Sequence, residues 1–293
     1  MKLTVFTPTY NRKDLLKRAY ESLKSQTCRD FAWLIVDDGS SDDTKSIVSK
    51  WQEEGVIPIE YFYCENGGKM RAHNRGVENC KTEWFLCLDS DDILVEDAVE
   101  RIYDFIDENK PGDDIGGIIA HKGKTREELL NGVGFPEGYI LKNKGRTSLY
   151  GLYLNGFKGE TTLVFRTDVL RKYPFPEIEG EKYVPEDYIY DKIDSEYGYL
   201  ILNKILTVCE LVSEGYTDSV RSLKENNREA WYLYYEQRAR ITPMSLLKLK
   251  YLAFYRLYAQ MAGHSIKEAE GIPGWQKALG LPGSVYLKLM GRV

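Results

Sequence analysis

The chain has 293 residues, of which 43% are hydrophobic, and this is enough for one large domain or for a medium domain with an extension. Its five cysteines are odd in number and form no CxxC pair, and its three histidines are scattered, so the composition argues against a disulfide framework and a zinc site. The formal net charge of -5 is uneven: residues 228–293 carry ten Lys/Arg and four Asp/Glu, a balance of +6, which leaves -11 for residues 1–227.

The first hundred residues alternate between strand and helix patterns. Short apolar runs predict four strands, and segments with helical spacing of apolar residues lie between them. These strands are expected at Leu3–Thr7, Phe31–Val36, Ile57–Tyr63 and Trp84–Leu88. Such alternation is typical of βαβ units, so we expect an α/β fold with a mostly parallel central sheet flanked by helices.

The later part of the chain is less regular. Ile115–Ala120 and Thr162–Arg166 have strand patterns, whereas residues 122–160 lack periodicity and are expected to form loops and short elements. Tyr188–Tyr197 predicts a helix. From about residue 226 the pattern is helical, with breaks expected at Pro243, Gly263, Pro273 and Pro282.

Four polar clusters lie at or beside the ends of the predicted strands: Pro8–Asn11, Asp37–Ser40, Gly67–Arg75 and Asp89–Asp92. The carboxyl ends of parallel strands share one edge of a sheet, so these clusters can meet around one ligand. The run Asp89-Ser90-Asp91-Asp92 concentrates three carboxylates, for which a hard divalent metal is a natural partner. Asp and Ser also terminate strands and cap helices, so a simple turn is the alternative.

Together these motifs resemble those of an inverting glycosyltransferase of family 2 with a GT-A fold. The resemblance covers roughly residues 1–215 and rests on Thr7–Asn11, Leu34–Asp42, Asn66–Lys69 with Asn74–Gly76, and Asp89–Asp92. It implies a nucleotide-sugar-binding and catalytic domain over 1–215, similar to the enzymes of bacterial polysaccharide biosynthesis. Residues 216–293 would form a helical C-terminal extension.

The resemblance also implies which residues contact the donor. Pro8, Tyr10 and Asp38 would surround the nucleotide base, with Asp38 accepting its imide hydrogen, and Lys69 and Arg75 would face the nucleotide. Two alternatives stay open at this point: Tyr10 could belong to the core, and the two cations could lie on a solvated helix face.

Asp89 and Asp91 correspond to the two acids of the family's DxD motif. By this resemblance Asp91 is the direct ligand of Mg²⁺ or Mn²⁺, while Asp89, also assigned to the metal site, acts through the donor ribose or through metal-bound water. Asp92 would only begin the next structural element.

Glycosyl transfer also needs a base, because an acceptor hydroxyl is a poor nucleophile until it loses its proton. The family places this acid in a Glu-Asp pair after the DxD motif, which Glu186-Asp187 matches, and Asp187 is the expected base. The alternative is that the pair only stabilises a helix N-terminus. Asp191 with Asp194 is a rival pair, and Glu160 is a candidate for acceptor contact.

The expected activity is metal-dependent, inverting transfer of a sugar from a nucleotide-sugar, UDP-linked by default, to a glycan or lipid-linked acceptor. A non-catalytic module that binds nucleotide-sugar or glycan on the same scaffold is the alternative. A nucleotide-dependent oxidoreductase is disfavoured because no GxGxxG follows the first strand, and nucleic-acid binding is not expected of an acidic body.

Residues 244–261 combine a wide apolar face with aromatic residues, Lys and Arg. A helix packed on the catalytic domain is the preferred interpretation, and docking on a membrane surface is the alternative. The first residues reach a Pro/Asn turn too early for a signal peptide, and no uncharged stretch is long enough to span a membrane. A cytoplasmic location is therefore expected, with peripheral contact at the inner membrane face as an open alternative.

Overall fold

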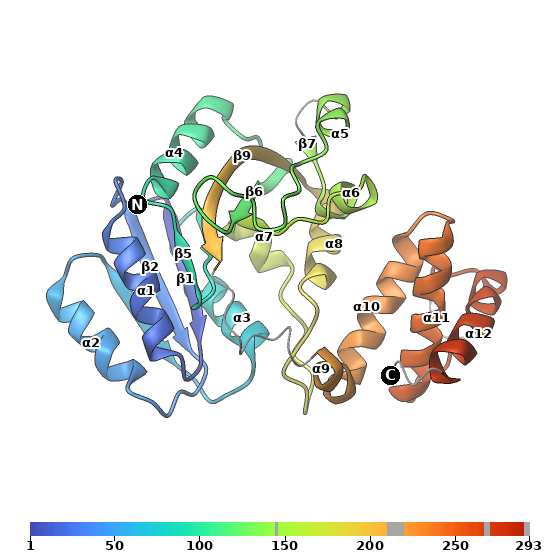
Figure 1. The fold of residues 1–293 in the computed structure, drawn as a ribbon. Coiled ribbons are helices and arrows are strands. Elements are labelled where there is room, and N and C mark those ends of the chain that lie inside the picture. The colour runs from blue at the N-terminus through green and yellow to red at the C-terminus, as the bar shows by residue number, and fades with distance from the viewer. Residues whose placement is uncertain (144–145, 210–219, 267–269, 290–293) are drawn as a thin grey trace. The chain divides into compact units, whose positions relative to one another are not determined.

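The computed structural model describes residues 1–143, 146–209, 220–266 and 270–289 (Figure 1). The chain divides into two compact units, the first formed by Met1–Pro174 with Ile189–Val212 and the second by Phe175–Tyr188 with Ser213–Val293. The domain boundary expected between residues 215 and 216 lies outside the described residues. Each unit has a hydrophobic core of its own.

A single mixed sheet forms the centre of the first unit, with the strand order β3-β2-β1-β4-β8-β6-β9-β5 and β7 paired to β9. The strands are β1 (Leu3–Thr9), β2 (Phe31–Asp37), β3 (Ile59–Tyr63), β4 (Trp84–Cys87), β5 (Asp92–Leu94), β6 (Ile115–Gly123), β7 (Arg146–Thr147), β8 (Thr161–Arg166) and β9 (Gly198–Cys209). The predicted α/β architecture is therefore confirmed, and all six predicted strands are present.

Parallel and antiparallel ladders are equally frequent among the described strands of this sheet, so it is mixed rather than mostly parallel. The ladders joining β3, β2, β1 and β4 are parallel, and so is the ladder between β6 and β9. In contrast, β8 runs antiparallel to both β4 and β6, and β5 and β7 run antiparallel to β9. Parallel neighbours need a long crossover, which the helices supply in the first half. Between β6 and β8 the chain instead folds back through α5 (Glu137–Lys142) and α6 (Leu149–Leu154), and so the direction reverses.

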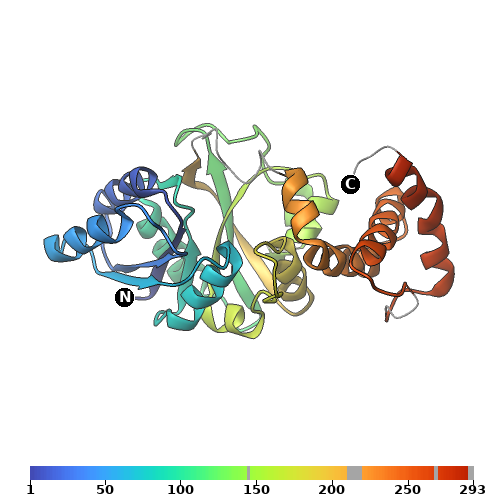
Figure 2. The same cartoon turned by 90° about the horizontal axis from the view of Figure 1, so that it is seen from below.

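Helices cover both faces of the sheet (Figures 1 and 2), and each face has its own cluster of buried side chains. In β1, Val5 belongs to the cluster beneath α1 (Lys13–Lys24), α2 (Thr44–Glu54) and α4 (Ala98–Asn109). Its neighbour Phe6 belongs to the opposite cluster, with α3 (Lys69–Asn79), α7 (Thr167–Lys172) and α8 (Asp187–Glu196). Because successive side chains point to opposite faces, the continuous apolar runs bury both faces of the sheet. The parallel direction of β1 to β4 places the carboxyl ends of these strands at a single edge.

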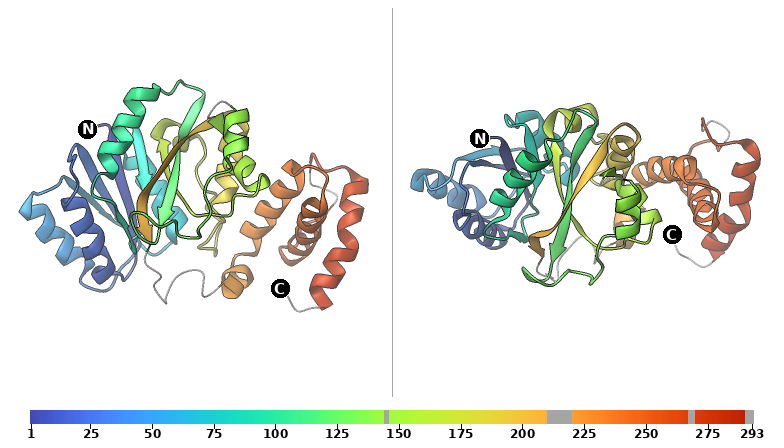
Figure 3. Two further views of the ribbon diagram at one scale, coloured as in Figure 1. Left: turned by 45° about the horizontal axis from the view of Figure 1, so that its top comes forward. Right: turned by 90° about the horizontal axis from the view of Figure 1, so that it is seen from above.

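The second unit contains α9 (Val220–Asn226), α10 (Arg228–Ile241), α11 (Leu246–Met261) and α12 (Gly274–Leu289), and Figure 3 shows the last three helices packed together. Aromatic residues of α10 and α11 dominate its core. The predicted helix breaks at Pro243, Gly263 and Pro273 are confirmed, but the break at Pro282 is wrong because α12 continues through it. Pro282 removes one backbone donor without ending the helix. In the part of the chain that the structure describes, no helix has the length and apolarity needed to span a membrane.

Candidate active site

The loops after β1, β2, β3 and β4 gather at one edge of the sheet, toward the bottom of Figure 1. The parallel register aligns Thr9 with Asp37, and the Cys64 N–H donates to the Asp37 carbonyl at 2.9 Å. Asn11 joins the first two loops, since its N–H donates to Ser40 Oγ and its Oδ1 accepts the Ser41 N–H, each at 2.8 Å. The polar clusters that followed separate strands in the sequence therefore lie side by side.

Asp38 organises the turn that begins α3. Its carboxylate is 5% exposed and accepts the N–H groups of Gly67 and Gly68, each at 2.8 Å, and the side-chain amide of Asn66 at 3.1 Å. A side chain at Gly39 would not fit, because a Cβ there would lie 2.8 Å from the Asn66 nitrogen and φ is +88°. Asp38, which the resemblance places against the nucleotide base, thus holds the glycine turn in place. A carboxylate has enough lone pairs to accept a further hydrogen-bond donor as well.

Asp37 is 1% exposed, and its carboxylate accepts hydrogen bonds from other groups of the protein. It accepts the Ser40 N–H at 2.8 Å and the Tyr61 hydroxyl at 2.6 Å. Burial, followed by this hydrogen bond to Asp37, raises the pKa of Tyr61, so the phenol stays protonated and remains a donor. Asp37 therefore stabilises the strand-end turn beside Asp38.

The three acids of the Asp89–Asp92 run each have a cationic partner. Lys69 Nζ lies 2.7 Å from Asp89, and Lys122 Nζ lies 2.7 Å from Asp92 and 3.8 Å from Asp89. Arg12 binds Asp91 at 3.1 Å. Each of the three carboxylates therefore lies next to a positive charge, which offsets the repulsion expected of neighbouring carboxylates.

Burial and charge act against each other in this cluster. Burial alone would raise the pKa of Asp89, but Lys69 and Lys122 outweigh it and hold that pKa below its ordinary value. Burial raises the pKa of Asp92, with Lys122 opposing the shift. Burial alone would lower the pKa of Lys122, whereas Asp89 and Asp92 raise it. Lys122 is therefore a fixed positive charge at neutral pH.

The predicted metal ligands have suitable chemistry and lack a complete shell. Asp89 and Asp91 offer hard oxygen donors and are 31% and 22% exposed in their side chains. Among the described residues, no group of three or more His, Cys, Asp or Glu side chains is placed to hold a metal ion. Mg²⁺ is commonly bound by one or two carboxylates together with substrate phosphates, so this donor set fits an ion that arrives with a nucleotide.

The remaining predicted donor contacts differ in exposure. Pro8 is buried at the end of β1, whereas Tyr10 is 48% exposed, which excludes the core alternative for Tyr10. Lys69 forms an ion pair with Asp89 of the acidic run, whereas Arg75 is exposed further along α3. The solvated-face alternative is therefore excluded for Lys69 and stays open for Arg75.

Asp187 is the first residue of α8 and belongs to the second unit, whereas the acidic run belongs to the first. Its carboxylate lies 3.0 Å from the guanidinium of Arg238, whose side chain is 5% exposed against 56% for Asp187. Partial burial of the carboxylate raises the pKa of Asp187, and Arg238 opposes this shift. The neighbouring Glu186 is half-buried.

The rival acids on α8 have other surroundings. Asp194 accepts the N–H groups of Leu149 and Tyr150 at 3.1 and 2.7 Å, so it caps the start of α6, and Asp191 is 6% exposed. Glu160 is exposed, and its carbonyl accepts the Lys122 N–H at 3.2 Å. Glu160 therefore lies next to the residue that neutralises the acidic run.

Sequence reasoning missed Arg12 and Lys122 and understated Asp92. Arg12 directly follows the Pro8–Asn11 cluster, and Lys122 is the second residue after the predicted strand Ile115–Ala120, which is the positional signal that identified the other clusters. Asp92 does begin β5, as expected, but it is also 5% exposed and paired with Lys122. Only the fold shows that β6 carries Lys122 to these acids.

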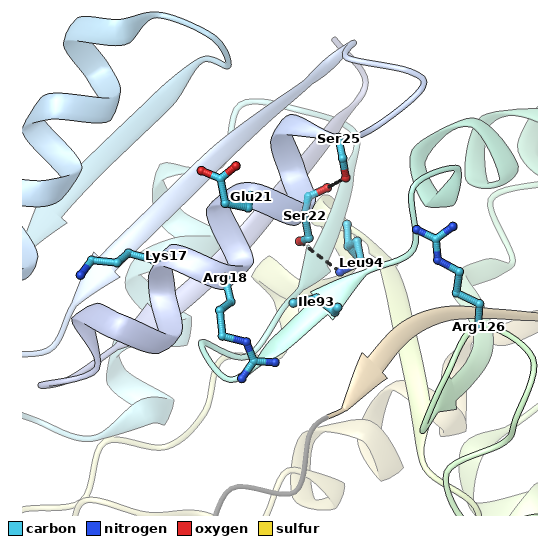
Figure 4. A pocket seen from close by; sticks show the side chains of 8 residues that line it. All are labelled: Lys17, Arg18, Glu21, Ser22, Ser25, Ile93, Leu94 and Arg126. Atoms are coloured by element: carbon cyan, nitrogen blue, oxygen red, sulfur yellow. Dashed lines mark hydrogen bonds between the residues drawn. The ribbon is translucent and has the colours of Figure 1, made fainter.

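A groove of about 410 Å³ lies elsewhere, between α1 and β5 (Figure 4). Lys17, Arg18 and Glu21 line it from α1, and Arg126 approaches from the segment after β6. Arg126 pairs with Glu96 at 2.7 Å. The groove shares no residue with the acidic cluster, so we do not assign the donor site to it.

Comparisons with known proteins agree with this architecture. The model of the family "Glycosyl transferase family 2" matches residues 4–173. A GalNAc(5)-diNAcBac-PP-undecaprenol beta-1,3-glucosyltransferase of Campylobacter jejuni is 28% identical over 95% of this chain and 87% of its own. Further curated relatives are matched over 18% to 38% of their own length.

Two solved structures share the fold. Staphylococcus aureus TarS 1-349 in complex with UDP-GlcNAc has a TM-score of 0.63 at 20% identity, covering 97% of this chain and 79% of its own. The mannosyltransferase PcManGT from Pyrobaculum calidifontis in complex with GDP-Man and Mn²⁺ has a TM-score of 0.59 at 18% identity, covering 98% and 80%. With its mixed sheet between helices matching these GT-A structures, the chain is a glycosyltransferase that belongs to glycosyltransferase family 2.

Proposed function

We propose that the sheet edge of the first unit binds a UDP-sugar and that the enzyme transfers its sugar, with inversion, to a lipid-linked or polymeric glycan acceptor in surface polysaccharide biosynthesis. Support comes from the Campylobacter relative, whose name specifies an undecaprenol-linked glycan, and from the UDP-GlcNAc complex of a fold neighbour. Such an acceptor favours a cytoplasmic enzyme working at the inner membrane face. In this proposal residues 1–215 form the catalytic domain and residues 216–293 the extension.

The observation that carries the proposal is that each acid of the run after β4 is paired with a cation from another element. Lys69 and Arg12 each bind an acid that is partly exposed, so both cations lie where a diphosphate would approach. A cation aimed at the leaving group stabilises the negative charge that develops there, and Arg can bind phosphate through two donors. Tyr10 and Asp38 would then hold the nucleotide base at the ends of β1 and β2.

Asp91 and Asp89 are the residues that would hold Mg²⁺ or Mn²⁺ next to the donor. When bound, the ion would polarise the diphosphate and so assist its departure. Lys69 and Arg12 would then be released from their acids toward the phosphate oxygens. Lys122 would keep Asp92 and the inner side of Asp89 neutralised throughout, because its contacts are buried.

Asp187 would act as the base. The acceptor oxygen forms a bond to the anomeric carbon while its proton moves to an Oδ atom of Asp187, and the bond from that carbon to the phosphate oxygen breaks with its electron pair leaving on UDP. The ion pair with Arg238 favours the ionised carboxylate that this role needs. The raised pKa makes that carboxylate a better proton acceptor.

Catalysis and the choice of base can be tested together. Purified protein with Mg²⁺ or Mn²⁺ is screened against UDP- and GDP-sugars, with a polyprenyl-diphosphate-linked glycan and a polymeric glycan as acceptors. Asp187→Asn should lower the single-turnover rate by about a hundredfold or more, while Glu186→Gln, the matched control, changes it little. A near wild-type rate for Asp187→Asn would exclude Asp187 as the base. Donor binding without transfer or hydrolysis across the panel would favour a binding module instead.

The metal part of the proposal has a separate measurement. Calorimetric titration of the donor should show tighter binding with Mn²⁺ than with EDTA, and Asp91→Ala should remove that difference. Glu160→Ala, an acid of the same unit outside the run, is the matched control and should retain it. Metal-independent binding by the wild type would contradict the metal assignment.

A further inference from the structure

Helix α12 turns its small and polar side chains toward the rest of its unit. Gln276, Gly280 and Ser284 recur every four residues and are buried. A Cβ on Gly280 would lie 2.5 Å from the carbonyl oxygen of Leu252, so the backbones of α11 and α12 are in close contact at this point. The face of α12 that α11 covers therefore offers few apolar atoms.

Most apolar side chains of α12 lie on the opposite side of the helix, whereas the half-buried Leu287 lies on the covered side. The large exposed ones are Trp275 (59% exposed), Leu279 (43%), Leu281 (50%), Val285 (49%) and Tyr286 (55%). At ~100° per residue these five, with Ala278 and Pro282, occupy an arc of roughly 160° that includes no charged residue. A helix at the surface of a globular protein has the opposite arrangement, with its apolar stripe toward the core.

The charges of this region are basic. Lys277 and Lys288 are the charged residues between positions 274 and 289, and both fall at the same border of the apolar arc. Residues 228–293 as a whole carry ten Lys/Arg and four Asp/Glu. Trp and Tyr in an apolar face with a basic border are typical of helices that lie in a membrane interface, where each Lys near the surface adds attraction to anionic lipid.

We propose that the outward face of α12 docks the protein on the surface of a bilayer that contains anionic phospholipid, with the helix lying in the interface plane. Pairing of this face with a second copy is disfavoured because it would bring two basic segments together. From sequence, residues 244–261 were the alternative candidate for membrane docking, with a packed helix preferred there. In the structure α11 buries most of its apolar side chains against its neighbours. This inference rests on the proposed function, which has the enzyme work at the inner membrane face, and it names the surface that docks there. Its failure would leave sugar transfer untouched, because vesicle binding and transfer are measured separately.

Co-sedimentation of the full chain with vesicles tests the proposal. Vesicles of phosphatidylcholine alone are compared with vesicles that also contain phosphatidylglycerol, at low and high salt. The test variant is Leu279→Glu, and the matched control is Leu154→Glu, a helical leucine of the first unit that is also 43% exposed. Unchanged circular dichroism and donor binding in both variants establish that they are folded.

We expect the protein to bind the anionic vesicles and the binding to weaken with salt. Leu279→Glu should reduce binding about tenfold or more, because it removes a leucine that the bilayer would bury and adds a negative charge that anionic lipid repels. Leu154→Glu should bind like the wild type. Brominated lipid should quench tryptophan emission in the wild type but not in Trp275→Phe. Wild-type protein that stays in the supernatant, or a dimer that Leu279→Glu dissociates without any effect on vesicle binding, would overturn the proposal.

Discussion

Replacing Lys122 by methionine isolates the buried cation beneath the acidic run. Methionine keeps most of the apolar stem and removes the ammonium group. The substitution leaves Asp92, whose side chain is 7% exposed, and Asp89 close together with one cationic partner fewer. Lys69 still neutralises Asp89 at 2.7 Å, so the deficit falls mainly on Asp92.

The expected magnitude follows from burial. Lys122 and Asp92 are 17% and 7% exposed in their side chains, so solvent screens their pair weakly. Removing one partner of a buried pair typically costs about 3–5 kcal/mol, because the other charge remains uncompensated. For a unit of this size, a loss of about 3 kcal/mol lowers the melting temperature by roughly 6–12 °C.

Urea titration and thermal melting, each followed by circular dichroism, measure this loss. The matched control is Lys124→Met, because Lys124 lies just after the same strand but is 50% exposed and pairs with Glu128 on the surface. Its expected loss is below about 1 kcal/mol. Adding Asp92→Asn to Lys122→Met should recover part of the stability, since the uncompensated charge is then gone.

The effect should also depend on pH. In Lys122→Met the pKa values of both acids rise, so protonation at low pH relieves the repulsion, and the difference from the wild type should shrink between about pH 7 and pH 4. A loss below about 1 kcal/mol at pH 7, or a loss that is the same at both pH values, would refute the reasoning that Lys122 acts as a buried counter-charge.

Three further predictions concern other parts of the chain. Asp38→Asn exchanges one acceptor of the glycine turn for a donor; it should cost about 1–3 kcal/mol and speed hydrogen exchange of the two glycine amides, and unchanged exchange would contradict it. Gly280→Ala should lower the melting temperature of the second unit, because a Cβ would meet a backbone carbonyl of α11, whereas Gly274→Ala, with open space, should not. The depressed pKa of Asp89 adds stability above about pH 4 that is lost as the pH falls through the folded-state pKa, so Asp89→Asn should flatten this acid limb in a pH series of urea titrations.

The local pattern of the chain was sufficient for much of the fold. All six predicted strands and the helix from Tyr188 are present, because apolar runs and helical spacing report burial directly. Strand β9 received no prediction, and its three partners β5, β6 and β7 come from distant parts of the sequence. Pro282 was predicted to end a helix that in fact continues. Proline removes one hydrogen bond, and packing of the rest of α12 on α11 outweighs that local loss.

The same contrast between local sequence pattern and contacts with distant segments applies to the site and to the C-terminal helices. By itself the sequence determined that polar clusters follow the parallel strands, because strand ends share an edge whenever the sheet is parallel. Tertiary structure decided how their charges are balanced: it brought Lys122 to Asp92 and turned the apolar face of α12 outward. Periodicity shows that a residue lies on a face or at an end, but the partner on the other side comes from a remote segment, and only the folded chain brings the two together.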